Sequence, residues 1–377
     1  MNYILALTGF SQSVSISATQ ILLGIMIIWT TWIIYKEGDF SLFKSRMFIF
    51  FCILYGSILL TFLFTENQFE HTKSLRNFWG MAFLFTAMFL VTDTEKLRTV
   101  ILSVIAGGCF AGVYAIYEYF FMDAGRVNGF MTHALTFGNS IVIILILCLF
   151  TVIDNKFKSR YDRLLCCTAL PVMFSALLLS GSRGPLLSLP LAVAVMLVAR
   201  YKAKGLVYSL ILCTLFTAAA FTVPSLSERF GKIFSAEYRV SNSSIGTRVV
   251  LWETSVKIIR DNPVFGVGYN NFQKNVRKYT DKPLASMAHA HNSYLHHAAI
   301  YGLTGLTALL LFLGAIGQEL AKAVKRKIPF SFGVLAAFLV FLLCGLTENN
   351  LGDSEVAMLM WLLAGSVMGI TFNGDSA

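Results

Sequence analysis

The sequence predicts an all-α fold: a polytopic helical membrane protein with about 11–12 transmembrane helices and one long loop outside the membrane. Hydrophobic residues make up 56% of the 377 residues and charged residues only 13%, whereas a soluble domain has about 25% charged residues. Apolar runs of roughly 16–24 residues recur along the chain, which is the length that a helix needs to cross about 30 Å of hydrocarbon. The sequence lacks the alternating segments of about ten residues that a membrane barrel requires.

Each long apolar run is interpreted as one span. The expected spans lie near residues 16–35, 47–64, 77–92, 99–122, 134–153, 164–180, 185–199, 206–223, 298–318, 329–346 and 356–372. Residues 1–15 lack the basic start and the cleavage site of a removable signal peptide. They are expected to form a short apolar segment before the first span, and the sequence leaves open whether this segment is a twelfth span. The simplest organisation is one membrane domain built from residues 1–223 and 298–377, with residues 224–297 as an inserted loop that carries the active-site motifs.

Basic residues alternate between rich and poor connections. The rich set contains Lys36, Lys44, Arg46, Lys96, Arg98, Lys156, Lys158, Arg160, Arg163, Arg200, Lys202, Lys204, Lys322, Lys325, Arg326 and Lys327, and the poor set contains Lys73, Arg76, Arg126 and Arg183. Because short cytoplasmic loops carry the excess of Lys and Arg, the rich set is predicted to face the cytoplasm. Alternation then places Arg183 and the long loop 224–297 together on the outer side.

The net charge of +10 does not indicate a nucleic-acid partner, because the basic residues follow the membrane topology and no nucleic-acid-binding motif is present. The seven cysteines all fall inside predicted spans. Neither a disulfide framework nor a cysteine zinc site is therefore expected.

Two arginines and a tryptophan are the first candidates for chemistry at the outer surface. Arg183 lies in the turn Ser182-Arg183-Gly184-Pro185 between two spans, and Arg248 and Trp252 share one face of a predicted helix that ends near Asp261. Thr247 or Ser244 is expected to cap this helix. Arginine offers a fork of permanently charged donors for phosphate oxygens. The structural alternatives are an arginine that reaches lipid headgroups and an interfacial helix that lies on the bilayer.

A histidine cluster precedes the span that starts near residue 298. We expect His291 to lie at the positive end of that helix, which disfavours the imidazolium form and suits a general base. The structural alternative is a set of interfacial histidines that hydrogen-bond locally. A metal site is not expected, because His291 and His296 are five residues apart and no glutamate lies between them. In the last outer loop, Glu348 and Asp353 are placed to orient an arginine or a substrate hydroxyl.

Together these features resemble the bacterial family of O-antigen ligases and related lipid-linked polysaccharide polymerases. The matching motifs are Ser182-Arg183-Gly184, Arg248 with Trp252, Pro263-Val264-Phe265-Gly266-Val267-Gly268, and His291-Asn292-Ser293-Tyr294-Leu295 leading into Gly302-Leu303-Thr304-Gly305. The number of spans and the position of the long loop match as well.

The resemblance implies a glycosyltransferase of the bacterial inner membrane whose active site faces the periplasm. Its donor would be a glycan linked to undecaprenyl diphosphate, and its acceptor lipid A-core or another glycan, with no metal, cofactor or nucleic acid needed. The family's catalytic residues map to Arg183, Arg248 and His291, and we add Trp252, His289, Asn292 and Glu348 as predicted substrate-binding residues. Ligation of O-antigen with inversion is the first expectation, followed by a polymerase and then by a ligase that glycosylates proteins. A transporter or flippase of lipid-linked glycans is the alternative from another class.

Overall fold

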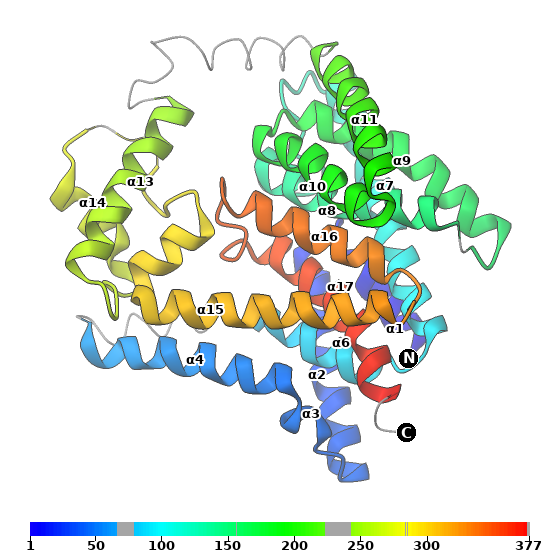
Figure 1. Ribbon diagram of the computed structural model, residues 1–377, viewed down its shortest axis with the longest axis horizontal. Coiled ribbons are helices and arrows are strands. Elements are labelled where there is room, and N and C mark those ends of the chain that lie inside the picture. Colours follow the sequence, from blue (N-terminus) through cyan, green and yellow to red (C-terminus); the bar gives the residue numbers. More distant parts are fainter. Residues whose placement is uncertain (66–78, 156, 223–242, 283, 285, 375–377) are drawn as a thin grey trace.

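The computed structural model describes residues 1–65, 79–155, 157–222, 243–282, 284 and 286–374, and this part of the chain is helical without a strand (Figure 1). Among these described residues, eight helices are long and apolar enough to cross a membrane. They are α2 (Ile16–Glu37), α4 (Arg46–Phe64), α7 (Thr94–Phe121), α8 (Ala134–Asp154), α9 (Arg160–Ser180), α10 (Arg183–Tyr201), α15 (Ser293–Lys325) and α17 (Ser354–Gly374). The predicted all-α, multi-pass membrane fold is confirmed.

The remaining predicted spans correspond to three helical segments that are not among these eight. They are η1 (Trp79–Met81) with α6 (Ala82–Leu90), α11 (Ala203–Phe221) and α16 (Ser331–Cys344). Residues 1–15 contain the ten-residue helix α1 (Asn2–Ser11), which packs against α7. The four-residue α3 (Ser41–Lys44) precedes α4. Every predicted span therefore contains a helix, and the predicted ends differ from the observed ends by a few residues.

The centre of the bundle is formed by α8 and α17. In their most apolar stretches 78% and 83% of the residues are buried, against 22% in α2 and in α4. Trp361 of α17 is fully buried between Phe312 of α15 and Phe341 of α16. Helices α2 and α4 therefore present most of their surface outward, where a lipid solvent would accept it.

Loops that were predicted to share a side meet at the same end of the bundle. At one end Arg98 donates to Asp162, with Nε to Oδ2 at 2.8 Å, and Arg46 donates to Gln318 at 2.8 Å. At the other end Thr136 donates to Asp353 at 2.7 Å. These contacts join connections from distant parts of the sequence in the grouping that the alternation predicts.

Two helices of the long loop lie at the end of the bundle where α15 begins (Figure 1). Helix α13 (Ser244–Asp261) packs against α15 and against α14 (Phe272–Tyr279), and the short η4 (Tyr269–Asn271) precedes α14. The predicted helix that ends at Asp261 is confirmed, but the predicted cap is wrong. Ser243 caps α13, because its hydroxyl accepts the Gly246 N–H at 2.9 Å.

The loop after α13 is fixed to a break in α15. Gly302 has φ +69° and ψ −174°, which interrupts the helix. Beside the break, Val267 and Gly268 donate their N–H groups to the carbonyls of Ala299 and Ile300 at 3.0 and 2.9 Å. Gly266 and Gly268 also have positive φ. This close approach of the two backbones at Gly266-Val267-Gly268 fixes α13 relative to the start of α15.

The Gly302→Ala substitution is expected to destabilise the protein. A Cβ at Gly302 would lie 2.0 Å from the Val264 carbonyl oxygen, and its positive φ costs an L-residue about 1–3 kcal/mol. The midpoint of thermal unfolding in detergent should fall by several degrees. Gly24→Ala in α2 is the control, because its Cβ meets nothing within 4 Å. Equal midpoints for the two variants would contradict the proposed anchoring.

Candidate active site

Four segments meet at the end of the bundle that carries α13. They are the start of α10, the first half of α13, the residues before α15 and the loop between α16 and α17. Gly184 contributes to this meeting, because a Cβ there would lie 2.6 Å from the Thr347 hydroxyl. The start of α10, with Arg183, therefore lies directly against the residue that precedes Glu348.

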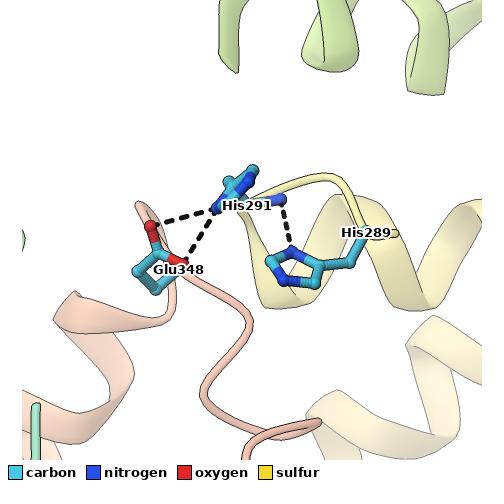
Figure 2. Close-up of side chains that lie close together, drawn as sticks. All are labelled: His289, His291 and Glu348. Carbon is cyan, nitrogen blue, oxygen red and sulfur yellow. Dashed lines mark hydrogen bonds and ion pairs between the residues drawn. The ribbon is translucent and has the colours of Figure 1, made fainter. Parts of the chain in front are cut away.

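Glu348 joins the predicted arginine to the predicted histidine. Glu348 is 6% exposed, and its carboxylate forms an ion pair with Nη2 of Arg248. The same carboxylate lies 3.0 and 3.2 Å from Nδ1 of His291 (Figure 2). Glu348 was predicted from its place in an outer loop, and the structure shows that it orients both side chains.

The electrostatics of this group favour an ionised Glu348. Burial raises the pKa of the Glu348 carboxyl, but the hydrogen bond from His291 and the positive charges of His291 and Arg248 outweigh burial and lower the pKa overall. An ionised carboxylate accepts hydrogen bonds and donates none. The proton of a neutral His291 therefore sits on Nδ1, which leaves the Nε2 lone pair available to accept a proton from a substrate.

His291 is held in an unusual backbone conformation. Its φ is +49°, and its N–H donates to Nδ1 of His289 at 3.2 Å. Helix α15 begins two residues later at Ser293. His291 thus lies at the positive end of that helix, as the sequence predicted.

A cavity of about 270 Å³ contains the predicted arginines and the tryptophan. We call it the arginine cavity, and its lining includes Arg126, Arg183, Arg248, Trp252 and Glu348. The first residues of α10 and of α13 line it too, so two helix N-termini add positive potential. Within the described part of the chain, Nε of Arg248 and Nε1 of Trp252 are buried N–H donors without a partner. The cavity is suited to a multiply charged anion.

Arg126 was not predicted as a site residue. Its Nε donates to the Ser180 carbonyl at 2.9 Å and its Nη2 to the Ser182 hydroxyl at 3.2 Å, which places it beside Arg183. The sequence did contain an indication of this role. Arg126 is one of the few basic residues in the predicted outer loops, where topology does not require positive charge.

Two further cavities meet at the histidines. One, of about 640 Å³, is lined by His289, His291 and Glu348, and the other, of about 360 Å³, by His289, His296 and His297. Asn292 lines none of the three cavities described here. Its Oδ1 caps α15 by accepting the N–H groups of Tyr294 and Leu295 at 3.0 and 2.9 Å. The substrate-binding role of Asn292 stays a prediction, while its observed role is structural.

His289, His291 and Glu348 are also the group in the described residues that could hold a metal ion. One ligand atom from each residue lies within 4.8 Å of the others. A divalent ion would compete with Arg248 for Glu348 and with the His291 N–H for Nδ1 of His289. The expectation of a metal-independent site stays a prediction, and metal analysis of the purified protein together with activity after chelation tests it.

His289 gives a prediction about stability and pH. Burial, followed by the charge of His291, lowers the pKa of His289 from 6.5 to about 4. The unfolded chain therefore binds this proton at a higher pH than the folded protein does, so the free energy of unfolding should fall as pH drops from about 6.5 to about 4. His289→Asn keeps an acceptor for the His291 N–H but cannot take up a proton. It should flatten this part of a plot of unfolding midpoint against pH, whereas the exposed control His133→Asn should not. An unchanged slope in His289→Asn would refute the assignment.

Fold and site together define a multi-pass helical membrane protein with an arginine-lined cavity and a His–Glu pair at one end. Residues 168–310 match the family model described as O-antigen ligase. The chain is also 25% identical over 300 residues to an uncharacterised protein of Haemophilus influenzae, a match that covers 74% of this chain and 73% of the relative.

The resemblance to O-antigen ligases is thereby confirmed for the matched segment, which contains Arg183, Arg248 and His291. Members of the family are ligases and polymerases that transfer glycans. Glycan transfer is thus the activity of the family that this chain resembles. Glu348 and Arg126 lie outside the matched residues and were connected to the site by the structure.

Proposed function

We propose that the protein transfers a glycan from undecaprenyl diphosphate to an acceptor sugar, and that it acts as an O-antigen ligase that uses lipid A-core as acceptor. The observation that carries the proposal is Glu348, which fixes His291 on one side and Arg248 of the arginine cavity on the other. Under this proposal, the base for the acceptor and the binding site for the anionic leaving group lie side by side.

The donor diphosphate would bind in the arginine cavity. Arg183 and Arg248 offer guanidinium forks to phosphate oxygens, and the N-termini of α10 and α13 favour negative charge. Charge that develops on the diphosphate as the glycosidic bond breaks is stabilised by these fixed donors. The guanidinium groups would supply the positive charge for which other transferases use a divalent ion.

His291 would activate the acceptor. Nε2 of His291 takes the proton of the attacking hydroxyl, and the hydroxyl oxygen bonds to the anomeric carbon of the donor. At the same time the C–O bond to the diphosphate breaks, and its electron pair stays on the leaving oxygen. One such displacement inverts the anomeric centre. Glu348 holds the Nδ1–H of His291 and so keeps the ring in the required tautomer and orientation.

The decisive experiment uses purified protein, a glycan on undecaprenyl diphosphate, and either lipid A-core or a second lipid-linked repeat unit as acceptor. Mass spectrometry then shows which acceptor gains the glycan. Transfer to lipid A-core supports the ligase, and transfer to the lipid-linked repeat supports the polymerase. Movement of the intact donor across vesicle membranes without a new glycosidic bond would instead support the transporter alternative and overturn the proposal.

Deletion of the gene separates the same two activities in the cell. Loss of a ligase should leave lipopolysaccharide without O-antigen, while long polymer accumulates on the lipid carrier. Loss of a polymerase should leave lipopolysaccharide that carries a single repeat. The single-repeat phenotype would exclude the ligase but not the proposed chemistry of Arg183, Arg248 and His291.

The proposed location is the bacterial inner membrane, with the site in the periplasm. A reporter fused after Lys204, in a basic connection, should indicate the cytoplasm, and one fused near Lys274 on α14 should indicate the periplasm. Alkaline phosphatase and a fluorescent protein serve as the paired reporters. If both fusions indicate the same side, the assignment of the site to the periplasm is wrong.

A further inference from the structure

A second polar cavity lies beside the arginine cavity. It has a volume of about 640 Å³, within the range of about 300–1,000 Å³ that is typical of ligand pockets. Leu135 and Glu348 line both cavities, so these two residues form a shared wall. His291 lines the second cavity, whereas Arg248 lines the first.

The two cavities differ in the charged side chains that line them. Arg126, Arg183 and Arg248 line the arginine cavity. The second cavity is lined by the carboxylates of Glu348, Asp353 and Glu355, and neither Lys nor Arg is among the described residues that line it. A phosphorylated ligand would meet three acidic side chains there but no guanidinium or ammonium group, whereas the arginine cavity offers it three guanidinium groups.

Polar atoms in the second cavity are available to a ligand. The amide oxygens of Asn139 and Asn350 are buried and have no hydrogen-bond partner in the described part of the chain, and the two residues are 2% and 1% exposed. Both residues line this cavity. Asp353 is held in place by the Thr136 hydroxyl at 2.7 Å. Buried acceptors without donors are costly, and a ligand rich in hydroxyl groups would satisfy them.

We propose that this second cavity binds the acceptor, and that it selects a neutral sugar with no phosphate near its reacting hydroxyl. The hydroxyl groups of such a sugar donate to Asn139, Asn350 and Asp353, and one hydroxyl is presented to His291. The inference rests on the proposed function, because it divides the two substrates of that reaction between two cavities. The partition by charge keeps the anionic donor group on the arginine side of Glu348.

Binding is measured without catalysis, so that the test does not depend on turnover. The probe is the core oligosaccharide released from rough lipopolysaccharide, used either with its phosphates or after phosphatase treatment. Isothermal titration of the full-length protein in detergent gives both affinities. The dephosphorylated form should bind at least about tenfold more tightly, the ratio that corresponds to about 1.4 kcal/mol.

Variants assign the probe to one cavity. Asn139→Leu should weaken binding of the dephosphorylated oligosaccharide about tenfold or more, because leucine has a similar size to asparagine but lacks the amide oxygen that accepts a hydrogen bond. Asp353→Asn should reduce the ratio between the affinities for the dephosphorylated and the phosphorylated oligosaccharide, because it removes one carboxylate. Glu118→Gln is the control at the same end of the bundle, since Glu118 accepts the Gly129 N–H at 2.7 Å and lines neither cavity. A geranyl diphosphate probe should bind the Asn139 and Asp353 variants as it binds the wild type, but should bind Arg183→Ala weakly.

The outcomes are distinguishable. Equal or tighter binding of the phosphorylated oligosaccharide, no binding of either form, or a loss of oligosaccharide binding in Arg183→Ala rather than in Asn139→Leu would each overturn the inference. Selective binding in this cavity without transfer in the enzymatic assay would support the saccharide site and reject the proposed transferase reaction.

Discussion

Arg248→Lys should lower the rate of glycan transfer by about 100-fold or more, although the positive charge is kept. The guanidinium of Arg248 forms an ion pair with Glu348 through Nη2 and donates from Nη1 to Ser244 at 2.9 Å, and its buried Nε remains without a partner among the described residues. Only a planar fork with separate donors can hold Glu348 and still present an N–H group to a phosphate oxygen. A lysine ammonium in this position cannot contact both Glu348 and the phosphate in this geometry.

Initial rates with lipid-linked donor and acceptor test this expectation. Arg46→Lys is the matched control, because Arg46 also donates a hydrogen bond from its guanidinium but lies at the opposite end of the bundle. Arg183→Lys should resemble Arg248→Lys, since both arginines line the same cavity. Rates near wild type in both site variants would show that any positive charge is sufficient, and the proposed role of the guanidinium geometry would be lost.

The helices were predictable from the sequence because each span is a local feature. An apolar run is recognised within about 20 residues, and the membrane requires it to form a helix. Arg183, Arg248 and His291 were found for a similar reason, since polar groups of these types are conspicuous in outer connections. Their positions beside the starts of α10, α13 and α15 could be inferred from the chain.

The arrangement of the site could not be predicted in the same way. Arg248 and Glu348 are 100 residues apart, and His291 and Glu348 are 57 apart. Such contacts depend on how α13 and the α16–α17 loop pack, which no local pattern specifies. Glu348 was predicted to orient an arginine or a substrate hydroxyl, but the sequence did not specify that its partners are Arg248 and His291. Arg126 contributed only to the count of basic residues.

Asn292 shows a different kind of omission. It was included among the substrate-binding residues because it lies next to His291 in the motif. An asparagine directly before a helix is, however, a common N-cap, and its side chain accepts N–H groups from the first turn. The observed bonds to Tyr294 and Leu295 follow this rule, so attention to capping would have predicted the structural role from the sequence.

His291→Ala should have the largest effect on turnover, a loss of about 1,000-fold or more, while the affinity for the donor is largely kept. His291 lines the cavity next to the arginine cavity and not the arginine cavity itself. Single-turnover rates and equilibrium binding of a lipid diphosphate separate the two effects. Donor binding that falls as much as the rate would place His291 with the leaving group and contradict its role as base.

Glu348→Gln should show how far the histidine depends on its partner. The neutral amide keeps a similar shape but removes the carboxylate that accepts from both His291 and Arg248, so we expect weaker catalysis and weaker donor binding together. Glu319→Gln is the control, because Glu319 pairs with Lys322 and Arg46 at the other end of the bundle. Residues that act as one unit give non-additive losses. The double variant His291→Ala with Glu348→Gln should therefore lose little more turnover than His291→Ala alone, and fully additive losses would mean that Glu348 acts mainly through Arg248.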